Sequence, residues 1–189
     1  MSPFEIVGVV AGILGVWLTT RQKVWCWPIG IVGVLAFVVV FFRVKLYAAM
    51  GLQFVYVGLS VYGWYAWLHG GEEHGALRVS RLPVRMVAGL GIAGAAGTVA
   101  FGWWLAQRTD EALPYLDAFT TVFSLIAQWM QARKRLENWL LWVIVDVVYV
   151  GMSLSQGLAL TSGLYLVYIA LAVLGYRDWR RSMHAGSPA

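Results

Sequence analysis

Long apolar runs alternate with short polar breaks along almost the whole 189-residue chain. A helix of roughly 20 mostly apolar residues spans a hydrocarbon core about 30 Å thick. Placing boundaries at charged and turn residues predicts seven helices, at residues 4–19, 25–42, 46–68, 84–107, 115–132, 138–154 and 158–176. A polar stretch, residues 69–83, separates the third helix from the fourth, and the residues after Trp179 are expected to form a short polar tail. The pattern predicts a single all-α transmembrane domain.

The composition agrees with a membrane protein. Apolar residues make up 60% of the chain and charged residues 12%, outside the range of soluble globular domains. Aromatic rings gather at the ends of the apolar runs, which is typical of belts at the membrane–water interfaces. Examples are Trp25, Trp27, Trp64, Trp67, Trp103, Trp104 and Trp179. The single cysteine excludes a multi-cysteine metal site, and the three histidines lie in a loop or the tail, so no metal and no cofactor is expected.

Lys and Arg lie in short loops, which favours a role in topology over a nucleic-acid partner. Eleven of the 14 fall on one side of the predicted helices: Arg21, Lys23, Arg78, Arg81, Arg85, Arg133, Lys134, Arg135, Arg177, Arg180 and Arg181. Arg43, Lys45 and Arg108 fall on the other side. Because cytoplasmic loops carry the excess of Lys and Arg, we expect the N-terminus outside and the C-terminus in the cytoplasm.

The chain resembles itself at a constant offset of 112 residues. The aligned pairs include Trp17 with Trp129, Arg21 with Arg133, Lys23 with Arg135, Trp27 with Trp139, Phe37 with Tyr149, Leu46 with Leu158, Gly51 with Gly163, Tyr56 with Tyr168, Gly63 with Gly175 and Trp67 with Trp179. Tryptophans, glycines and loop cations carry this match, because Leu and Val pair by chance in any membrane protein. We therefore predict a duplication, with one repeat over about residues 4–68 and the other over about 115–179.

One helix, over about residues 84–107, lies between the two repeats. A single intervening span returns the chain to its starting side, so both three-helix repeats cross the membrane in the same direction. This is a parallel repeat in a 3+1+3 arrangement, related by an axis along the membrane normal. A substrate path between the halves, with its site near the middle of the bilayer, follows as a hypothesis.

The sixth predicted helix carries an acidic residue deep in an apolar run. Trp139, Trp142, Asp146 and Tyr149 fall on one stripe of this helix. Ionisable residues inside a membrane are costly and mark functional sites by default. Indole rings and a carboxylate together suit a flat, cationic ring, although Asp146 could instead bond a neighbouring helix while the tryptophans only pack.

Gln53 in the third predicted helix is a second candidate, and the 112-residue offset pairs it with Tyr165 in the seventh. Both side chains could reach a site between the halves. Gln53 could equally form a hydrogen bond between helices, which is common in membrane bundles. Gln128 and Gln131 are compatible with helix-end positions, so neither is assigned to the site.

Three segments carry a family resemblance: residues 137–146, residues 46–53 and residues 62–67. Together they resemble the PnuC family of bacterial vitamin transporters, and the likeness runs from Phe4 to Trp179. Its most specific part is a WxxWxxx(N/D) pattern, matched by Trp139, Trp142 and Asp146. Many nicotinamide riboside carriers have Asn at the last position, and Gly33 stands where a polar Asn is expected, so these departures bear on which vitamin is carried.

The resemblance implies a SWEET-like fold, homotrimers in the bacterial inner membrane, and facilitated diffusion of nicotinamide riboside, a precursor of NAD. It also implies trapping of the substrate by a separate cytoplasmic kinase. Carried over by position, Trp139, Trp142 and Asp146 would contact the substrate, with Gln53 and Tyr165 as further contacts. Relatives carry thiamine, riboflavin or deoxynucleosides, and these remain alternatives. An integral-membrane enzyme or a regulatory subunit is less favoured, because one buried acid without a neighbouring histidine makes a poor catalytic cluster.

Overall fold

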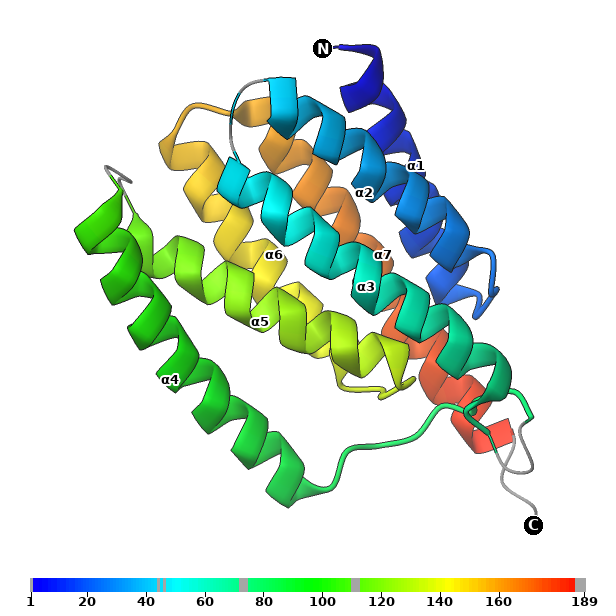
Figure 1. Ribbon diagram of the computed structural model, residues 1–189. Coiled ribbons are helices and arrows are strands. Elements are labelled where there is room, and N and C mark those ends of the chain that lie inside the picture. Colours follow the sequence, from blue (N-terminus) through cyan, green and yellow to red (C-terminus); the bar gives the residue numbers. More distant parts are fainter. Residues whose placement is uncertain (1, 44, 46, 72–74, 110–112, 186–189) are drawn as a thin grey trace.

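The computed structural model describes residues 2–43, 45, 47–71, 75–109 and 113–185. Within these residues the chain forms seven α-helices (Figure 1). They are α1 (Pro3–Thr20), α2 (Cys26–Arg43), α3 (Tyr47–His69), α4 (Val84–Arg108), α5 (Pro114–Ala132), α6 (Asn138–Ser155) and α7 (Ala159–Ala185). The all-α fold predicted from the sequence is confirmed, and the first six helices begin and end within one residue of their predicted bounds.

The predicted end of the seventh helix is wrong. α7 continues to Ala185, well past residue 176, and the expected polar tail is helical up to that point. Trp179 is fully buried and Met183 packs against the same apolar cluster. Gln22 also donates a hydrogen bond from Nε2 to Ser182 Oγ over 2.8 Å. Tertiary contacts therefore extend the helix beyond the point where the apolar run stops.

Local signals explain where α1 and α5 start. Ser2 and Glu5 form a reciprocal capping box, in which each side chain accepts a hydrogen bond from the other residue's backbone N–H. These bonds satisfy donors that the first turn leaves unpaired. Pro3 and Pro114 occupy first-turn positions, where the missing N–H costs nothing.

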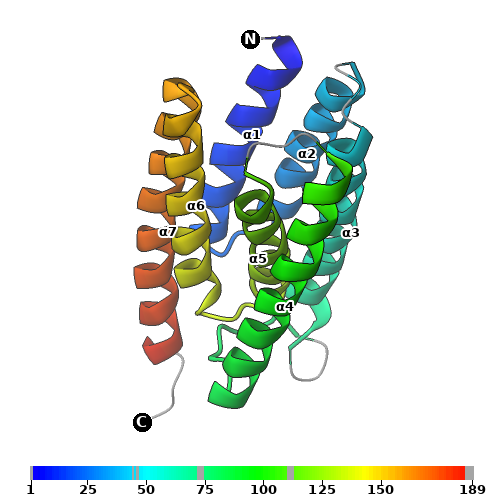
Figure 2. The ribbon, with the colours of Figure 1, turned by 90° about the vertical axis from the view of Figure 1, so that its left-hand side faces the viewer.

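Six helices pack in a closed ring in the order α1, α2, α3, α5, α6, α7, and α7 returns to α1. Figure 2 shows α6 and α7 on one side, α2 and α3 on the other, and α1 and α5 between them. α4 packs along α5 on the outside of this ring (Figures 1 and 2). The two three-helix repeats thus meet along two seams, α1 with α7 and α3 with α5.

Five of the seven helices, α1, α2, α4, α6 and α7, are long and apolar enough to cross a membrane. α3 and α5 fall below that hydropathy. α5 carries Thr120, Ser124, Gln128 and Gln131, and α3 is rich in Tyr, Trp and Gly. Polar residues that face the inside of a bundle lower a helix's mean hydropathy without exposing polarity to lipid.

The same backbone turns recur 112 residues apart. Gln22, after α1, has φ 53°, and Lys134, after α5, has φ 46°. Each is followed by the same backbone hydrogen bond, from Lys23 N to Leu18 O over 3.0 Å and from Arg135 N to Met130 O over 2.9 Å. The turns that end α2 and α6 also contain matching left-handed residues, Lys45 and Gly157.

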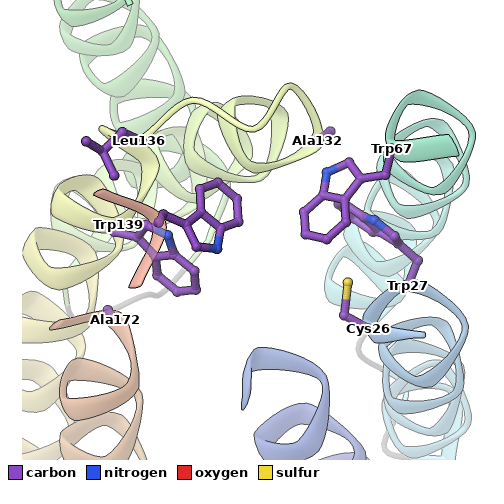
Figure 3. Packing of buried hydrophobic residues seen from close by; sticks show 8 residues of the cluster. Cys26, Trp27, Trp67, Ala132, Leu136, Trp139 and Ala172 are labelled. Atoms are coloured by element: carbon purple, nitrogen blue, oxygen red, sulfur yellow. The ribbon is translucent and has the colours of Figure 1, made fainter. Parts of the chain in front are cut away.

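Four tryptophans close the basic end of the ring, and we call Trp27, Trp67, Trp139 and Trp179 the closing layer. They are at most 2% exposed. Figure 3 shows Trp27 and Trp67 with Cys26 on one side of the layer and Trp139 with Leu136 and Ala172 on the other. The interpretation of Trp27, Trp67 and Trp179 as interface residues is therefore wrong. Trp25 and Trp103, which are 70% and 60% exposed, remain compatible with an interface belt.

The closing layer is symmetric. Trp27 meets Trp67 edge to face at 5.4 Å between ring centroids, and Trp139 meets Trp179 in the same way at 5.3 Å. Across the seams, Trp67 Nε1 donates to the carbonyl oxygen of Gln131 over 3.1 Å, and Trp179 Nε1 donates to that of Thr19 over 2.9 Å. Each repeat thus donates one indole N–H to the other repeat.

Lys134 sits on the closing layer, where its ammonium lies 4.4 Å from the centroid of the Trp67 ring. Lys134 Nζ also donates to Gln22 Oε1 over 3.4 Å, which joins the two turns across the pseudo-symmetry axis. Burial lowers the pKa of the Lys134 ammonium from its ordinary value of 10.5. The contacts with Trp67 and Gln22 therefore offset only part of the cost of removing this charge from water.

Candidate substrate site

Two adjoining cavities lie inside the six-helix ring, with volumes of about 290 Å³ and 320 Å³. Every helix of the ring contributes to their walls, and no residue of α4 does. Pockets of this size, with a few polar groups in an aromatic wall, are typical of small-molecule sites. The closing layer borders them, because Trp139 lines the first cavity and Trp27 the second.

We call the first space the acidic cavity, because Asp146 lines it. Its walls come mainly from the second repeat. The lining residues are Gly12, Val16, Tyr56, Ser124, Gln128, Gln131, Trp139, Trp142, Asp146, Tyr149, Tyr165, Tyr168 and Ala172. The four stripe residues of α6 and Tyr165 of α7, all singled out from the sequence, thus meet around one space.

Asp146 is the only charged side chain in the acidic cavity's wall. It is 5% exposed, and no other residue in the described part of the chain forms a hydrogen bond or an ion pair with its carboxyl group. A buried carboxylate without a partner is costly, and it is stabilised by a cation or a hydrogen-bond donor that enters the cavity. The alternative in which Asp146 bonds a neighbouring helix finds no support among these residues.

Trp142 forms the wall between the two cavities and lines both. Its Nε1 donates a hydrogen bond to Gln131 Oε1 over 3.1 Å, which fixes the plane of the indole. The backbone carbonyl of Gln131 accepts the hydrogen bond from Trp67 in the closing layer. Gln131 thus links the cavity wall to the layer that closes the basic end.

Tyrosines form the opposite side of the acidic cavity. The rings of Tyr149 and Tyr165 stack in parallel at 4.5 Å, and Tyr168 meets Tyr165 edge to face at 6.2 Å. Tyr56 on α3 shares a short hydrogen bond with Ser124 on α5, which ties the α3–α5 seam together at the cavity. Flat aromatic faces on several sides suit a planar ring.

Two predicted site residues have different surroundings from the rest. Trp139 lines the acidic cavity, but its ring packs so tightly on α7 that a Cβ added at Gly175 would lie 2.5 Å from it. It therefore has a structural role in the closing layer as well. Gln53 lines the second cavity, and its partner by repeat, Tyr165, lines the first, so the structure does not bring these two into one cavity.

Tyr56, Ser124, Gln128, Gln131 and Tyr168 also line the acidic cavity, and sequence reasoning did not select them. A signal was present in α5. Thr120, Ser124, Gln128 and Gln131 recur at helical spacing on one face of an apolar helix. Treating Gln128 and Gln131 as helix-end residues missed this stripe.

The sequence profile of the family described as "Nicotinamide mononucleotide transporter" matches residues 2–181. The chain belongs to this family. It is 28% identical over 207 residues to "Nicotinamide riboside transporter PnuC" of Escherichia coli, covering 96% of this chain and 87% of that protein. It is 33% identical over 180 residues to "Riboflavin/roseoflavin transporter RibM" of Streptomyces davaonensis, covering 93% and 83%.

A solved structure agrees with this assignment. The fold matches the "Crystal structure of the Vitamin B3 transporter PnuC" with a TM-score of 0.77 at 27% identity, over 97% of this chain and 83% of that one. The protein is thus a multi-pass membrane transporter of the PnuC family of vitamin carriers, and not an enzyme. The family resemblance found in the sequence is confirmed.

Proposed function

We propose that this transporter carries nicotinamide riboside by facilitated diffusion, with Trp139, Trp142, Asp146, Tyr149 and Tyr165 around its nicotinamide ring and Gln53 in reach of the rest of the molecule. The observation that carries this proposal is the carboxyl group of Asp146, which lacks a partner in the described protein and lies in an aromatic cavity. The pyridinium ring of nicotinamide riboside is flat and positively charged. Such a ring stacks on indole and phenol faces and supplies the missing counter-charge.

The proposed mechanism is uniport with alternating access. The closing layer seals the cavities at the basic end, and its indole N–H bonds join the two repeats. Exchange of the site between the two sides requires these bonds to break while bonds elsewhere hold the repeats together. Because no gradient other than that of the substrate is used, the carrier equilibrates the vitamin, and removal by a cytoplasmic kinase makes uptake net inward.

Riboflavin is the second candidate, and one observation favours it. The relative with 33% identity is named as a riboflavin/roseoflavin transporter, whereas the nicotinamide riboside transporters reach 28%. Riboflavin has a larger, neutral ring, which gives Asp146 a hydrogen-bonding role in place of a counter-charge. Thiamine, whose ring is also cationic, and deoxynucleosides are less favoured alternatives.

A calorimetric comparison of nicotinamide riboside, thiamine, riboflavin and deoxynucleosides against the purified protein tests the substrate. We expect nicotinamide riboside to bind at least tenfold more tightly than the others. Uptake of the labelled vitamin into proteoliposomes, followed by recovery of the unchanged compound, tests transport. Preferred binding of riboflavin would overturn the substrate proposal while leaving the family assignment intact.

We also propose that the protein lies in the bacterial cytoplasmic membrane with its N-terminus outside and its C-terminus inside, as a homotrimer. The excess of Lys and Arg at one end supports this orientation. α4 offers an apolar outer surface to lipid or to neighbouring protomers, with Val84, Ile92, Val99 and Trp103 each at least 60% exposed. Reporter fusions at the two termini test the orientation, and native mass spectrometry tests the trimer.

A further inference from the structure

The two repeats differ most where they face the cavities. On α6 the wall positions are Trp142, Asp146 and Tyr149, and the 112-residue offset pairs them with residues of α2. Their counterparts are Gly30, Val34 and Phe37. One repeat therefore has an indole and an acid where the other has no side chain and an isopropyl group.

This difference opens the second cavity. A Cβ built on Gly30 meets nothing within 4 Å, so the position that corresponds to the Trp142 indole is empty space. The cavity beside it has a volume of about 320 Å³ and includes Gly8, Gly12, Gly15, Gly30 and Gly33 in its wall. We call it the glycine-lined cavity. It is a product of sequence divergence between two otherwise similar repeats.

The polar groups of the glycine-lined cavity are neutral. None of its lining residues is Asp, Glu, Lys, Arg or His. Gln53, Ser60 and Gln128 supply amide and hydroxyl groups, and the contact from Gln128 Nε2 to Ser60 Oγ is long, at 3.5 Å. Ser60 is only 4% exposed, so its weakly used hydroxyl is out of reach of bulk water. Amides and hydroxyls that both donate and accept match the hydroxyl groups of a sugar or polyol.

The two cavities are close enough for one ligand. Gly12, Val16, Tyr56, Gln128, Gln131, Trp142 and Tyr168 line both. A molecule with a flat ring in the acidic cavity can therefore extend past the edge of Trp142 into the glycine-lined cavity. The acidic cavity alone, at about 290 Å³, has its polar groups grouped around the ring position.

We propose that the glycine-lined cavity is a second subsite, which holds the neutral polyhydroxylated part of the substrate, and that Gly30 sets its size. Gln53 acts in this subsite and not on the ring. The inference rests on the proposed function in placing the substrate's ring beside Asp146. It goes further by making the absence of a side chain at residue 30 a determinant of specificity.

The test compares ligands that share a ring and differ in the polyol. Nicotinamide riboside and 1-methylnicotinamide carry the same cationic ring, with and without the sugar. In calorimetric titrations, Gly30→Trp is expected to weaken nicotinamide riboside binding at least tenfold and to change 1-methylnicotinamide binding less than threefold. Gly51→Trp is the matched control, because a Cβ there also meets nothing within 4 Å but the residue lies outside both cavities.

Gln53→Leu gives a second measurement that leaves residue 30 unchanged. It is expected to weaken nicotinamide riboside binding about three- to tenfold and to leave 1-methylnicotinamide binding unchanged. Gly30→Val replaces Gly30→Trp if the larger variant does not elute as a folded protein. Equal losses for both ligands, or no loss for nicotinamide riboside, overturn the subsite.

The result also separates this inference from the proposed function. If wild-type protein binds neither nicotinamide ligand but binds riboflavin, the proposed substrate is wrong and the subsite is tested with riboflavin and lumiflavin, which share a ring and differ in the ribityl chain. Gly30→Trp is then expected to weaken riboflavin binding at least tenfold and lumiflavin binding less than threefold. Equal effects on that pair overturn the subsite as well.

Discussion

The two repeats agree at the basic end of the bundle and differ in its middle. At the closing layer, Trp27 and Trp67 repeat the geometry of Trp139 and Trp179 to within 0.1 Å and 3°. At the cavities, by contrast, Asp146 faces a valine counterpart, Val34. Groups that must act in both halves have kept their identity, and groups that contact one asymmetric substrate have diverged. Symmetry within the chain therefore separates residues of the closing mechanism from residues of recognition.

The largest effects are expected from side chains added under the closing layer. A Cβ at Gly63 would lie 2.3 Å from the Trp27 ring, and one at Gly175 would lie 2.5 Å from the Trp139 ring. Overpacking of rigid rings costs roughly 1–3 kcal/mol. Gly63→Ala and Gly175→Ala should each lower the melting temperature in detergent by roughly 4–10 °C.

Gly51 and Gly163 are matched controls, because they lie on the same two helices, are also related by 112 residues, and have nothing within 4 Å of an added Cβ. Replacing either with Ala should raise the melting temperature by about 2 °C, since Ala favours helix by roughly 1 kcal/mol over Gly. Equal destabilisation at all four glycines would contradict the proposed role of the closing layer.

The next effect concerns Trp142, which has no aromatic counterpart in the first repeat. Trp142→Phe keeps a ring but removes the hydrogen bond to Gln131 and part of the indole face. Substrate affinity should fall about tenfold, or about 1.4 kcal/mol, in calorimetric titration. Trp104→Phe, at an exposed position on α4, should leave the affinity unchanged. Identical affinities for the two variants would remove Trp142 from the site.

The indole N–H bonds between repeats should contribute equally. Trp67→Phe and Trp179→Phe each remove one bond to a carbonyl of the other repeat, at a cost of about 1 kcal/mol. Both should increase labelling of Cys26, the chain's single cysteine, which is buried against this layer. Reaction with a membrane-impermeant maleimide from the basic side measures this opening.

Trp64→Phe, at a more exposed position on α3, is the control and should not change Cys26 labelling. Increased labelling in only one of Trp67→Phe and Trp179→Phe would show that the closing layer does not act symmetrically.

Lys134 should have the smallest effect, because its favourable contacts and its burial oppose each other. Its pKa is lowered by burial, so the folded protein binds this proton less tightly than the unfolded chain. Stability from this group therefore rises with pH between the lowered pKa and the ordinary value of 10.5. Lys134→Met should change the melting temperature by only a few degrees at pH 7 and remove that rise. A steep loss of stability in the variant at pH 7 would show that the contacts with Trp67 and Gln22 dominate.

The sequence predicted the fold well because apolar runs, loop cations and a duplicated pattern of tryptophans are local features. It also identified the α6 stripe, whose residues meet at one cavity. It did not predict that Trp27 and Trp67 are buried, because a ring at a helix end has the same pattern in a belt and in a core. Nor did it separate Gln53 from Tyr165, since the cavities arise from packing between helices distant in sequence.

The most direct test of the central claim compares nicotinamide riboside with its neutral 1,4-dihydro form in wild-type protein and in Asp146→Asn. The two ligands differ mainly in the ring's charge, and the two proteins differ in the charge that faces it. Wild-type protein should prefer the cationic ligand at least tenfold by calorimetry, and Asp146→Asn should lose most of that preference. Equal preference in both proteins would contradict the account, because Asp146 would then not recognise the charge of the ring.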